Sequence, residues 1–283
     1  MDEKKEPTRG EELRKALSYE KKNGYDRLLP GEREVMEEYC DSYKQFLDAG
    51  KTERECVDRT VALAENAGFR PYIRGNDLKA GDKVYRVNRD KSVMLAVIGR
   101  QSLSQGVRIC AAHIDSPRLD LKQNPLYESD ELAFLKTHYY GGIRKYQWVT
   151  IPLELHGVVA LKSGQVIRVS VGNGEGDPLF TIDDLLPHLG AEQSRKPLGE
   201  AIPGENLNIL VGSRPLADDE GKDRVKLSVL ELLNRKYGIV EEDFISAELA
   251  AVPAFRACDI GFDRSMIGAY GHDDRVCAYA CLA

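Results

Sequence analysis

The sequence pairs a histidine and an aspartate, His113 and Asp115, at a spacing that suits metal chemistry. The pair follows the apolar run 107–110, which is predicted to be a buried strand, and Pro117 then interrupts the strand pattern. Residues i and i+2 of an extended segment point to the same side, so both side chains can face one pocket. An imidazole with a carboxylate beside it is typical of metal sites. An ordinary histidine at a strand end, hydrogen-bonded to a neighbouring aspartate, has the same pattern. The pair alone therefore does not distinguish a metal site from a structural histidine.

Two adjacent carboxylates near the end of the chain are a second candidate for metal binding. They are Asp273 and Asp274. They lie in the segment 271–275, Gly-His-Asp-Asp-Arg, at a predicted loop-to-helix junction, where the helix N-terminus stabilises an anion. Two divalent cations about 3.5–4 Å apart repel each other unless an anion lies between them. A carboxylate here, together with His113, could therefore begin a two-metal site. The ordinary alternative is an N-cap followed by an acidic residue in the first turn.

Three helices and then a set of short strands are expected to position the first pair. Helical spacing and capping boxes predict the helices, and apolar runs separated by polar turns predict the strands. Such an order indicates an α/β layer fold with the His-x-Asp pair at the carboxyl end of a strand. The predicted helices cover 8–24, 31–47 and 52–67, and the predicted strands cover 82–87, 92–98 and 107–112.

The middle of the chain has a different character, and the first pattern returns after it. Short glycine-punctuated strands predict a β-rich insertion, with one amphipathic helix over 225–237 and a helical turn that reaches His188. The final apolar run, 276–283, is predicted to begin a buried helix, and the chain is expected to continue beyond it in a longer protein. The expected organisation is a first domain part over 1–118, an insertion over 119–252, and a return over 253–283. The strands predicted from 119 onward cover 133–139, 149–160, 166–171 and 244–252.

Composition narrows the class of protein. The chain has 283 residues, of which 42% are apolar and 30% charged, enough to bury a core. The net charge of −6 and the lack of a basic cluster argue against nucleic acid as a partner. No apolar run approaches the roughly 20 residues that span a bilayer, and Met1–Glu6 does not resemble a signal peptide. Six cysteines without a CxxC pair indicate reduced thiols and a cytoplasmic protein.

Several motifs in order give the chain a family resemblance. They are His-Ile-Asp-Ser-Pro at 113–117, Tyr-Gly-Gly at 140–142, Pro-His-Leu at 187–189, Gly-His-Asp-Asp at 271–274, and the segment 46–55. With them the chain resembles the aspartyl aminopeptidase / aminopeptidase I family of dinuclear zinc peptidases over nearly its whole length. The resemblance implies an α/β peptidase domain with a central, mostly parallel sheet, interrupted by a β-rich dimerisation domain. It also implies homo-oligomers built from dimers and peptide substrates.

The resemblance also implies roles for individual residues. His113 matches a zinc ligand, and Asp115 matches the catalytic acid that orients this histidine. Asp273 matches the carboxylate that bridges two zinc ions, and Asp274 stands beside it in a supporting position. His188 matches a substrate-binding histidine that approaches the neighbouring subunit's active site. Co²⁺ or Mn²⁺ could replace Zn²⁺ at such a centre.

The chain departs from the family after the bridging aspartate. The family completes its site with a Glu-Glu pair, another Asp and a late His, all downstream of the position that Asp273 matches. The acidic pair Glu241-Glu242 precedes Asp273 and lies in a polar turn, so it is not a substitute. Catalytic zinc normally takes three protein ligands. The chain is therefore expected to be the N-terminal part of an aminopeptidase that releases N-terminal residues, acidic ones among the options, and to be weakly active or inactive by itself.

Other readings remain open. A non-catalytic oligomerisation or cargo protein could keep the peptidase fold, although such a protein need not keep metal ligands. A different metallohydrolase, such as a deacylase, fits the β-rich insertion less well.

Among the other histidines, His138 and His156 are expected to be satisfied within strands, His156 at a strand edge. His272 is expected to serve as a cap or supporting residue.

Overall fold

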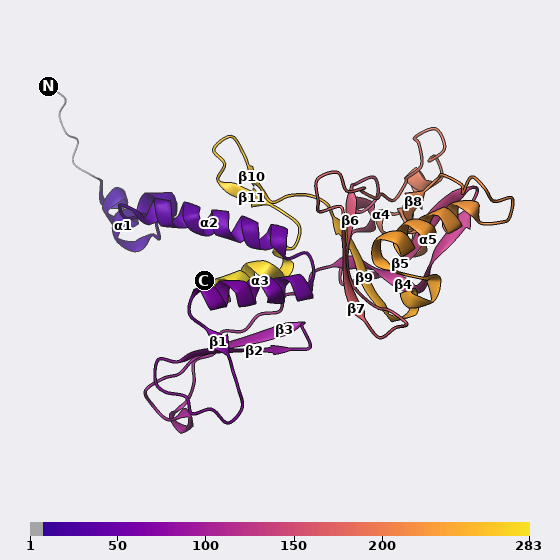
Figure 1. Ribbon diagram of the computed structural model, residues 1–283. Helices are drawn as coiled ribbons and strands as arrows, with labels where there is room; N and C mark the ends of the chain where they lie inside the picture. The colour runs from indigo at the N-terminus through magenta and orange to yellow at the C-terminus, as the bar shows by residue number, and fades with distance from the viewer. Residues whose placement is uncertain (1–7) are drawn as a thin grey trace. The chain divides into compact units, whose positions relative to one another are not determined.

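The computed structural model describes residues 8–283, and Figure 1 labels its elements. The expectation that Met1–Glu6 is not a signal peptide lies outside these residues. The chain divides into two compact units, one that ends at Ser42 and one from Tyr43 to Ala283. The first unit contains α1 (Arg9–Leu17) and the first part of α2 (Glu32–Ala49). The predicted capping box opens α1, but the helix ends well before the predicted stop at residue 24.

The second unit begins with the end of α2 and continues into α3 (Glu53–Asn66). The predicted capping box is confirmed, since the Thr52 side chain accepts from the Glu55 N–H and the Glu55 side chain accepts from the Thr52 N–H. Helix α3 packs on a small sheet in which β2 pairs in parallel with β1 and antiparallel with β3 (Figure 1). The strands are β1 (Arg70–Pro71), β2 (Lys83–Asn88) and β3 (Ser92–Val97).

The largest sheet has six strands in the order β7-β6-β9-β4-β5-β8, and every neighbouring pair is antiparallel. It corresponds to the predicted β-rich region. Its strands are β4 (Arg118–Ser129), β5 (Leu132–Tyr140), β6 (Leu153–Ala160), β7 (Val166–Val171), β8 (Ile209–Gly212) and β9 (Ala247–Pro253). The expected central, mostly parallel sheet is not seen among residues 8–283, where β1 and β2 form the sole parallel pair.

The predicted strand 107–112 is the main error at the level of elements. These residues lie outside every strand, and Val107 and Ile109 are 60% and 78% exposed. A strand forms only where a neighbour completes its hydrogen bonds, and no strand in the described part of the chain pairs with this run. The run is apolar, but a strand also needs a pairing partner, and residues 8–283 contain none for this run.

Helix α5 (Arg224–Tyr237) covers one face of the six-stranded sheet, close to the predicted 225–237 (Figure 1). The Glu128 carboxylate of β4 accepts hydrogen bonds from two backbone N–H groups in the first turn of this helix, those of Val225 and Lys226. Side chains without solvent exposure form the core beneath it. They are Leu119, Leu153, Val159, Ile209 and Ala251.

The remaining elements follow or connect the large sheet. Hairpin β10 (Cys258–Ile260) and β11 (Met266–Gly268) leads into α6 (His272–Leu282), the predicted final helix. Tyr279 of α6 packs against Tyr43 and Phe46 in a second, smaller core. The short helices are α4 (Leu198–Ala201) and 3-10 turns at Tyr25–Arg27, Leu103–Gln105, Lys145–Gln147, Gln193–Arg195, Gly204–Asn206 and Glu241–Ser246.

Two expectations from composition can be compared with the structure. Among residues 8–283, no helix is both long enough and apolar enough to cross a bilayer. All six cysteines lie in this range, and none of them forms a disulfide. The helical turn expected to reach His188 does not begin at Thr181, because residues 182–186 are irregular. A single turn at 187–189 contains His188, and the Leu186 carbonyl accepts from the Leu189 and Gly190 N–H groups.

Candidate metal centre

His113 and Asp115 meet as their spacing predicts. His113 Nδ1 lies 2.9 Å from Asp115 Oδ1, in the irregular segment just before β4. Asp115 Oδ2 accepts a hydrogen bond of 2.7 Å from the Tyr140 hydroxyl at the end of β5. Because a carboxylate only accepts, Nδ1 is the donor toward Asp115, and Nε2 is directed away from Asp115. This is the orientation that a histidine ligand needs.

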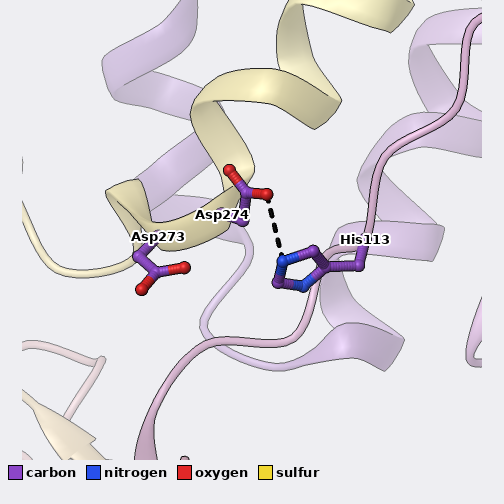
Figure 2. Close-up of side chains that lie close together, drawn as sticks. All are labelled: His113, Asp273 and Asp274. Atoms are coloured by element: carbon purple, nitrogen blue, oxygen red, sulfur yellow. Dashed lines mark ion pairs between the residues drawn. The ribbon is translucent and has the colours of Figure 1, made fainter. Parts of the chain in front are cut away.

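The second pair of carboxylates lies opposite His113. Figure 2 shows His113 facing Asp273 and Asp274, which come from the start of α6. Asp274 Oδ2 lies 3.0 Å from His113 Nε2, and ligand atoms of the three residues lie within 4.8 Å of one another. The Asp273–Asp274 peptide bond is cis, and both residues have non-helical backbone angles. Gly271, two residues before Asp273, has a positive φ of 94°, which favours glycine, and a Cβ there would lie 2.3 Å from Arg275 Nη1.

Two residues that sequence reasoning did not single out hold these segments together. The Arg275 guanidinium is 1% exposed and donates to the Ile114 carbonyl at 3.2 Å and to the Lys51 carbonyl at 3.0 Å. The Tyr270 hydroxyl donates to the Pro117 carbonyl at 3.1 Å. The sequence did contain a signal for the role of Arg275, because it directly precedes the apolar run 276–283 and is therefore expected to be buried. A buried charge needs several hydrogen-bond partners.

The other histidines lie outside the cluster. His272 Nε2 is 3.1 Å from the Ile267 carbonyl and Nδ1 is 3.0 Å from the Tyr43 hydroxyl, so both nitrogens serve the scaffold. His188 is exposed in its turn, and His138 is exposed on β5 with its ring stacked on Tyr139.

His156 corrects an expectation. It lies on β6, an interior strand between β7 and β9, and not at a sheet edge. Its side chain is fully buried, with Nδ1 2.7 Å from Glu55 Oε1 and Nε2 3.4 Å from Glu154 Oε1. Strand spacing alone does not distinguish interior from edge strands, which explains the error.

Electrostatics at the centre favour a charged Asp115. Burial would raise the pKa of Asp115, but hydrogen bonds from Tyr140 and His113 bring it below its ordinary value. The hydrogen bond with Asp115 raises the pKa of His113, and the carboxylates of Asp273 and Asp274 act in the same direction. A metal ion that binds Nε2 replaces the proton held there.

The donor set fits zinc, which binds imidazole nitrogen and carboxylate oxygen. One histidine and two aspartates are the sole group of three or more such donors found close together among residues 8–283. Three donors match the number that one catalytic zinc normally takes, and two ions would need more. The same donors also suit Co²⁺ or Mn²⁺.

Comparison with known proteins agrees with this chemistry. The family model described as "Aminopeptidase I zinc metalloprotease (M18)" matches residues 46–283. The "Probable M18 family aminopeptidase 1" of Clostridium acetobutylicum is 51% identical over 267 residues, which are 93% of this chain and 57% of that protein. The crystal structure of an M18 family aminopeptidase from Thermotoga maritima matches with a TM-score of 0.85 at 44% identity. The match covers 94% of this chain and 57% of that one.

A more distant structure, the yeast mApe1 dodecamer, is 17% identical with a TM-score of 0.64 and shares the fold. It is matched over 88% of this chain and 55% of its own. This chain thus spans little more than half the length of the relatives that it matches.

Proposed function

The chain belongs to the M18 family of aminopeptidase I zinc metalloproteases, and we propose that it carries one side of a two-zinc peptidase centre. The observation that supports this most strongly is the convergence of His113, Asp273 and Asp274, with Asp115 behind the histidine. His113 is the proposed zinc ligand and Asp273 the proposed bridging carboxylate. Asp274 is assigned a supporting position, although its carboxylate is close enough to His113 to serve as a further ligand.

Each residue has a distinct task in this proposal. Asp115 accepts the Nδ1 proton of His113 and so keeps Nε2 available for metal. The carboxylate of Asp273 supplies the negative charge that two neighbouring cations require. Bound zinc would polarise the first peptide carbonyl and activate a water molecule. Arg275 and Tyr270 keep the His113 segment against the start of α6, so that ligands far apart in sequence share one site.

The rest of the centre is assigned to sequence outside this chain. The described residues offer one cluster of donors, and the relatives are much longer than this chain. We therefore expect further ligands and a general base from the remaining part of a protein of family length. This chain alone is expected to bind zinc incompletely and to hydrolyse peptides weakly or not at all.

Substrate, assembly and organisation follow the same proposal. The substrate is a peptide that loses one N-terminal residue at a time, with acidic residues as one option. The segments 1–118 and 253–283 belong to the peptidase domain, and 119–252 forms an inserted dimerisation domain. We expect homo-oligomers built from dimers. We also expect the protein to be cytoplasmic. Exposed Leu185, Leu186 and Leu189 surround His188 in sequence, and such an apolar surface suits a subunit contact.

The test compares metal content and activity. Zinc per chain and hydrolysis of Asp-, Glu- and Leu-anilides are measured for this chain and for a version extended to the length of its relatives. We expect about two zinc ions per extended chain and clear activity. His113→Asn and Asp273→Asn should lower both, whereas the exposed controls His138→Asn and Asp130→Asn should change neither.

Two outcomes would contradict the proposal. An extended protein that binds zinc but cleaves none of the anilides would favour the non-catalytic oligomerisation or cargo protein. Full activity of this chain by itself would refute the assignment of the missing groups to the remaining sequence.

A further inference from the structure

Tyr140 lies outside the donor cluster, yet it is connected to the cluster by an unbroken chain of hydrogen bonds. Its hydroxyl donates to Asp115 Oδ2 at 2.7 Å, and Asp115 Oδ1 is 2.9 Å from His113 Nδ1. The two oxygens of Asp115 therefore have separate partners. A carboxylate with one partner can rotate about its last torsion, whereas two partners fix its plane.

Packing cannot replace these hydrogen bonds at His113. The side chain of His113 is 56% exposed, so neighbouring atoms do not hold the ring in place. Its direction is set by Asp115 on one nitrogen and by Asp274 on the other. A metal ion at Nε2 would displace Asp274 from that nitrogen, so Asp115 would remain as the protein partner of the ring, and Asp115 is itself held by Tyr140.

Tyr140 itself is held in place from two sides. The Arg118 guanidinium lies 4.2 Å from the centre of the Tyr140 ring, and the two residues are cross-strand partners in β4 and β5. Arg118 in turn pairs with Glu53 of α3 at 2.8 Å and with Asp120 at 2.7 Å. Tyr140 is thus fixed by the register of the large sheet and by a cation that reaches α3.

The backbone after Tyr140 supports the same placement. Gly141 has a positive φ of 75°, and a Cβ there would lie 3.4 Å from Pro117 atoms. The end of β5 therefore lies directly against the segment that carries His113 and Asp115.

We propose that Tyr140 is a positioning residue for the metal ligand His113, acting through Asp115. This inference rests on the proposed function. It extends that function, because a residue at the end of β5 then helps to orient a metal ligand. The six-stranded sheet then contributes to metal affinity through one hydroxyl group. Loss of a group that orients a metal ligand typically weakens metal binding 10–100-fold.

The experiment removes that hydroxyl and nothing else. Tyr140→Phe keeps the ring under Arg118, and Tyr140 is 40% exposed, so the fold is expected to persist. Tyr139→Phe is the matched control, since Tyr139 is a neighbouring tyrosine of the same exposure on the same strand. Zinc affinity is measured by competition with a chromophoric chelator, and the urea midpoint of each variant is recorded.

We expect Tyr140→Phe to weaken zinc binding by about 10-fold, and Tyr139→Phe to leave it within twofold of the unchanged chain. Urea midpoints of both variants should match the unchanged chain, which separates a positioning role from a structural one. Equal zinc affinity of the Tyr140→Phe variant and the unchanged chain would overturn the inference.

A second measurement does not depend on zinc. Ring nitrogen NMR shifts of metal-free, ¹⁵N-histidine-labelled protein report which nitrogen of His113 carries the proton when the ring is neutral, with His113→Asn identifying the signal. Nδ1–H should dominate in the unchanged chain and in Tyr139→Phe, and should decrease in Tyr140→Phe. An unaltered tautomer would overturn the inference, whereas zinc uptake indifferent to His113→Asn would refute only the proposed metal centre.

Discussion

At the scale of single residues, Arg275 joins the two segments of the candidate centre without taking part in its chemistry. It follows Asp274 directly, and its guanidinium reaches back to the carbonyl groups of Ile114 and Lys51. A buried acceptor that loses its donor costs about 1–3 kcal/mol. The side chain that follows the acidic pair is thus as important for assembling the site as the pair itself.

Replacing Arg275 by Met is therefore expected to lower the free energy of unfolding by about 3 kcal/mol, because two carbonyl oxygens lose a charged donor. Urea unfolding measures the difference. Arg264→Met is the control, since the Arg264 side chain is 77% exposed and its ion pair with Asp259 should be worth under about 1 kcal/mol. Similar losses in both variants would show that burial of Arg275 has no special weight.

Residue types and spacing made His113, Asp115, Asp273 and Asp274 candidates, the family resemblance selected them, and the structure brings all four together. They were accessible because polar side chains at fixed offsets leave a pattern in the sequence. Arg275 was not assigned a role, because its partners are backbone carbonyl groups, which every residue has. Hydrogen bonds to the backbone thus escape sequence reasoning even where they decide the geometry.

At the scale of elements, helix boundaries were predictable where a cap defined them and strands where a neighbour was present. Thr52 and Glu55 form the expected capping box at the start of α3. The apolar run 107–112 has the composition of a strand but no partner among the described residues. Pairing is a property of two segments, so a single run cannot predict it.

The contact between α3 and β6 predicts a pH dependence of stability. Burial alone would lower the pKa of His156, but hydrogen bonds with Glu154 and Glu55 raise it to about 9. The charged form of His156 therefore stabilises the fold below the unfolded pKa of about 6.5, and this contribution is lost as pH rises through 9. The unfolding free energy should fall by about 3 kcal/mol between pH 6 and pH 10 from this group alone.

Urea unfolding of His156→Gln tests this contribution. The difference between pH 6 and pH 10 should shrink in that variant, because the titrating group is gone. His138→Gln, an exposed position on β5, should keep the difference of the unchanged chain. A pH profile that is the same in all three proteins would show that the His156 cluster does not govern it.

At the scale of the whole molecule, His188 is the residue that the proposal assigns to a contact between subunits. His188 lies outside the metal cluster, in an exposed turn flanked by exposed leucines. In the extended protein we expect His188→Ala to lower activity at least tenfold while zinc content is retained, because His188 is assigned to a neighbouring subunit's site.

Mixed assembly provides the decisive form of this experiment. Inactive His188→Ala and Asp115→Ala proteins are unfolded together and refolded as mixtures. Part of the activity should return, since some sites then combine an intact His188 with an intact Asp115 from different subunits. Mixtures that stay as inactive as each variant would place His188 outside the site.

The position of β9 in the large sheet also sets an order of events in time. Within the described residues, β9 alone pairs with both the β4–β5 hairpin and the β6–β7 hairpin, although it is the last of the six strands to be synthesised. Until β9 is synthesised, the two hairpins are linked in the sheet, among residues 8–283, only through the bridges of Phe180 to Leu153 and of Thr181 to Leu210. The sheet is therefore expected to close late. Amide exchange should find the N–H groups of β4 and β6 that bond to β9 unprotected in chains that end at Ser246 and protected in chains that end at Ala283. Protection of both strands in the shorter chain would show that the hairpins associate without β9.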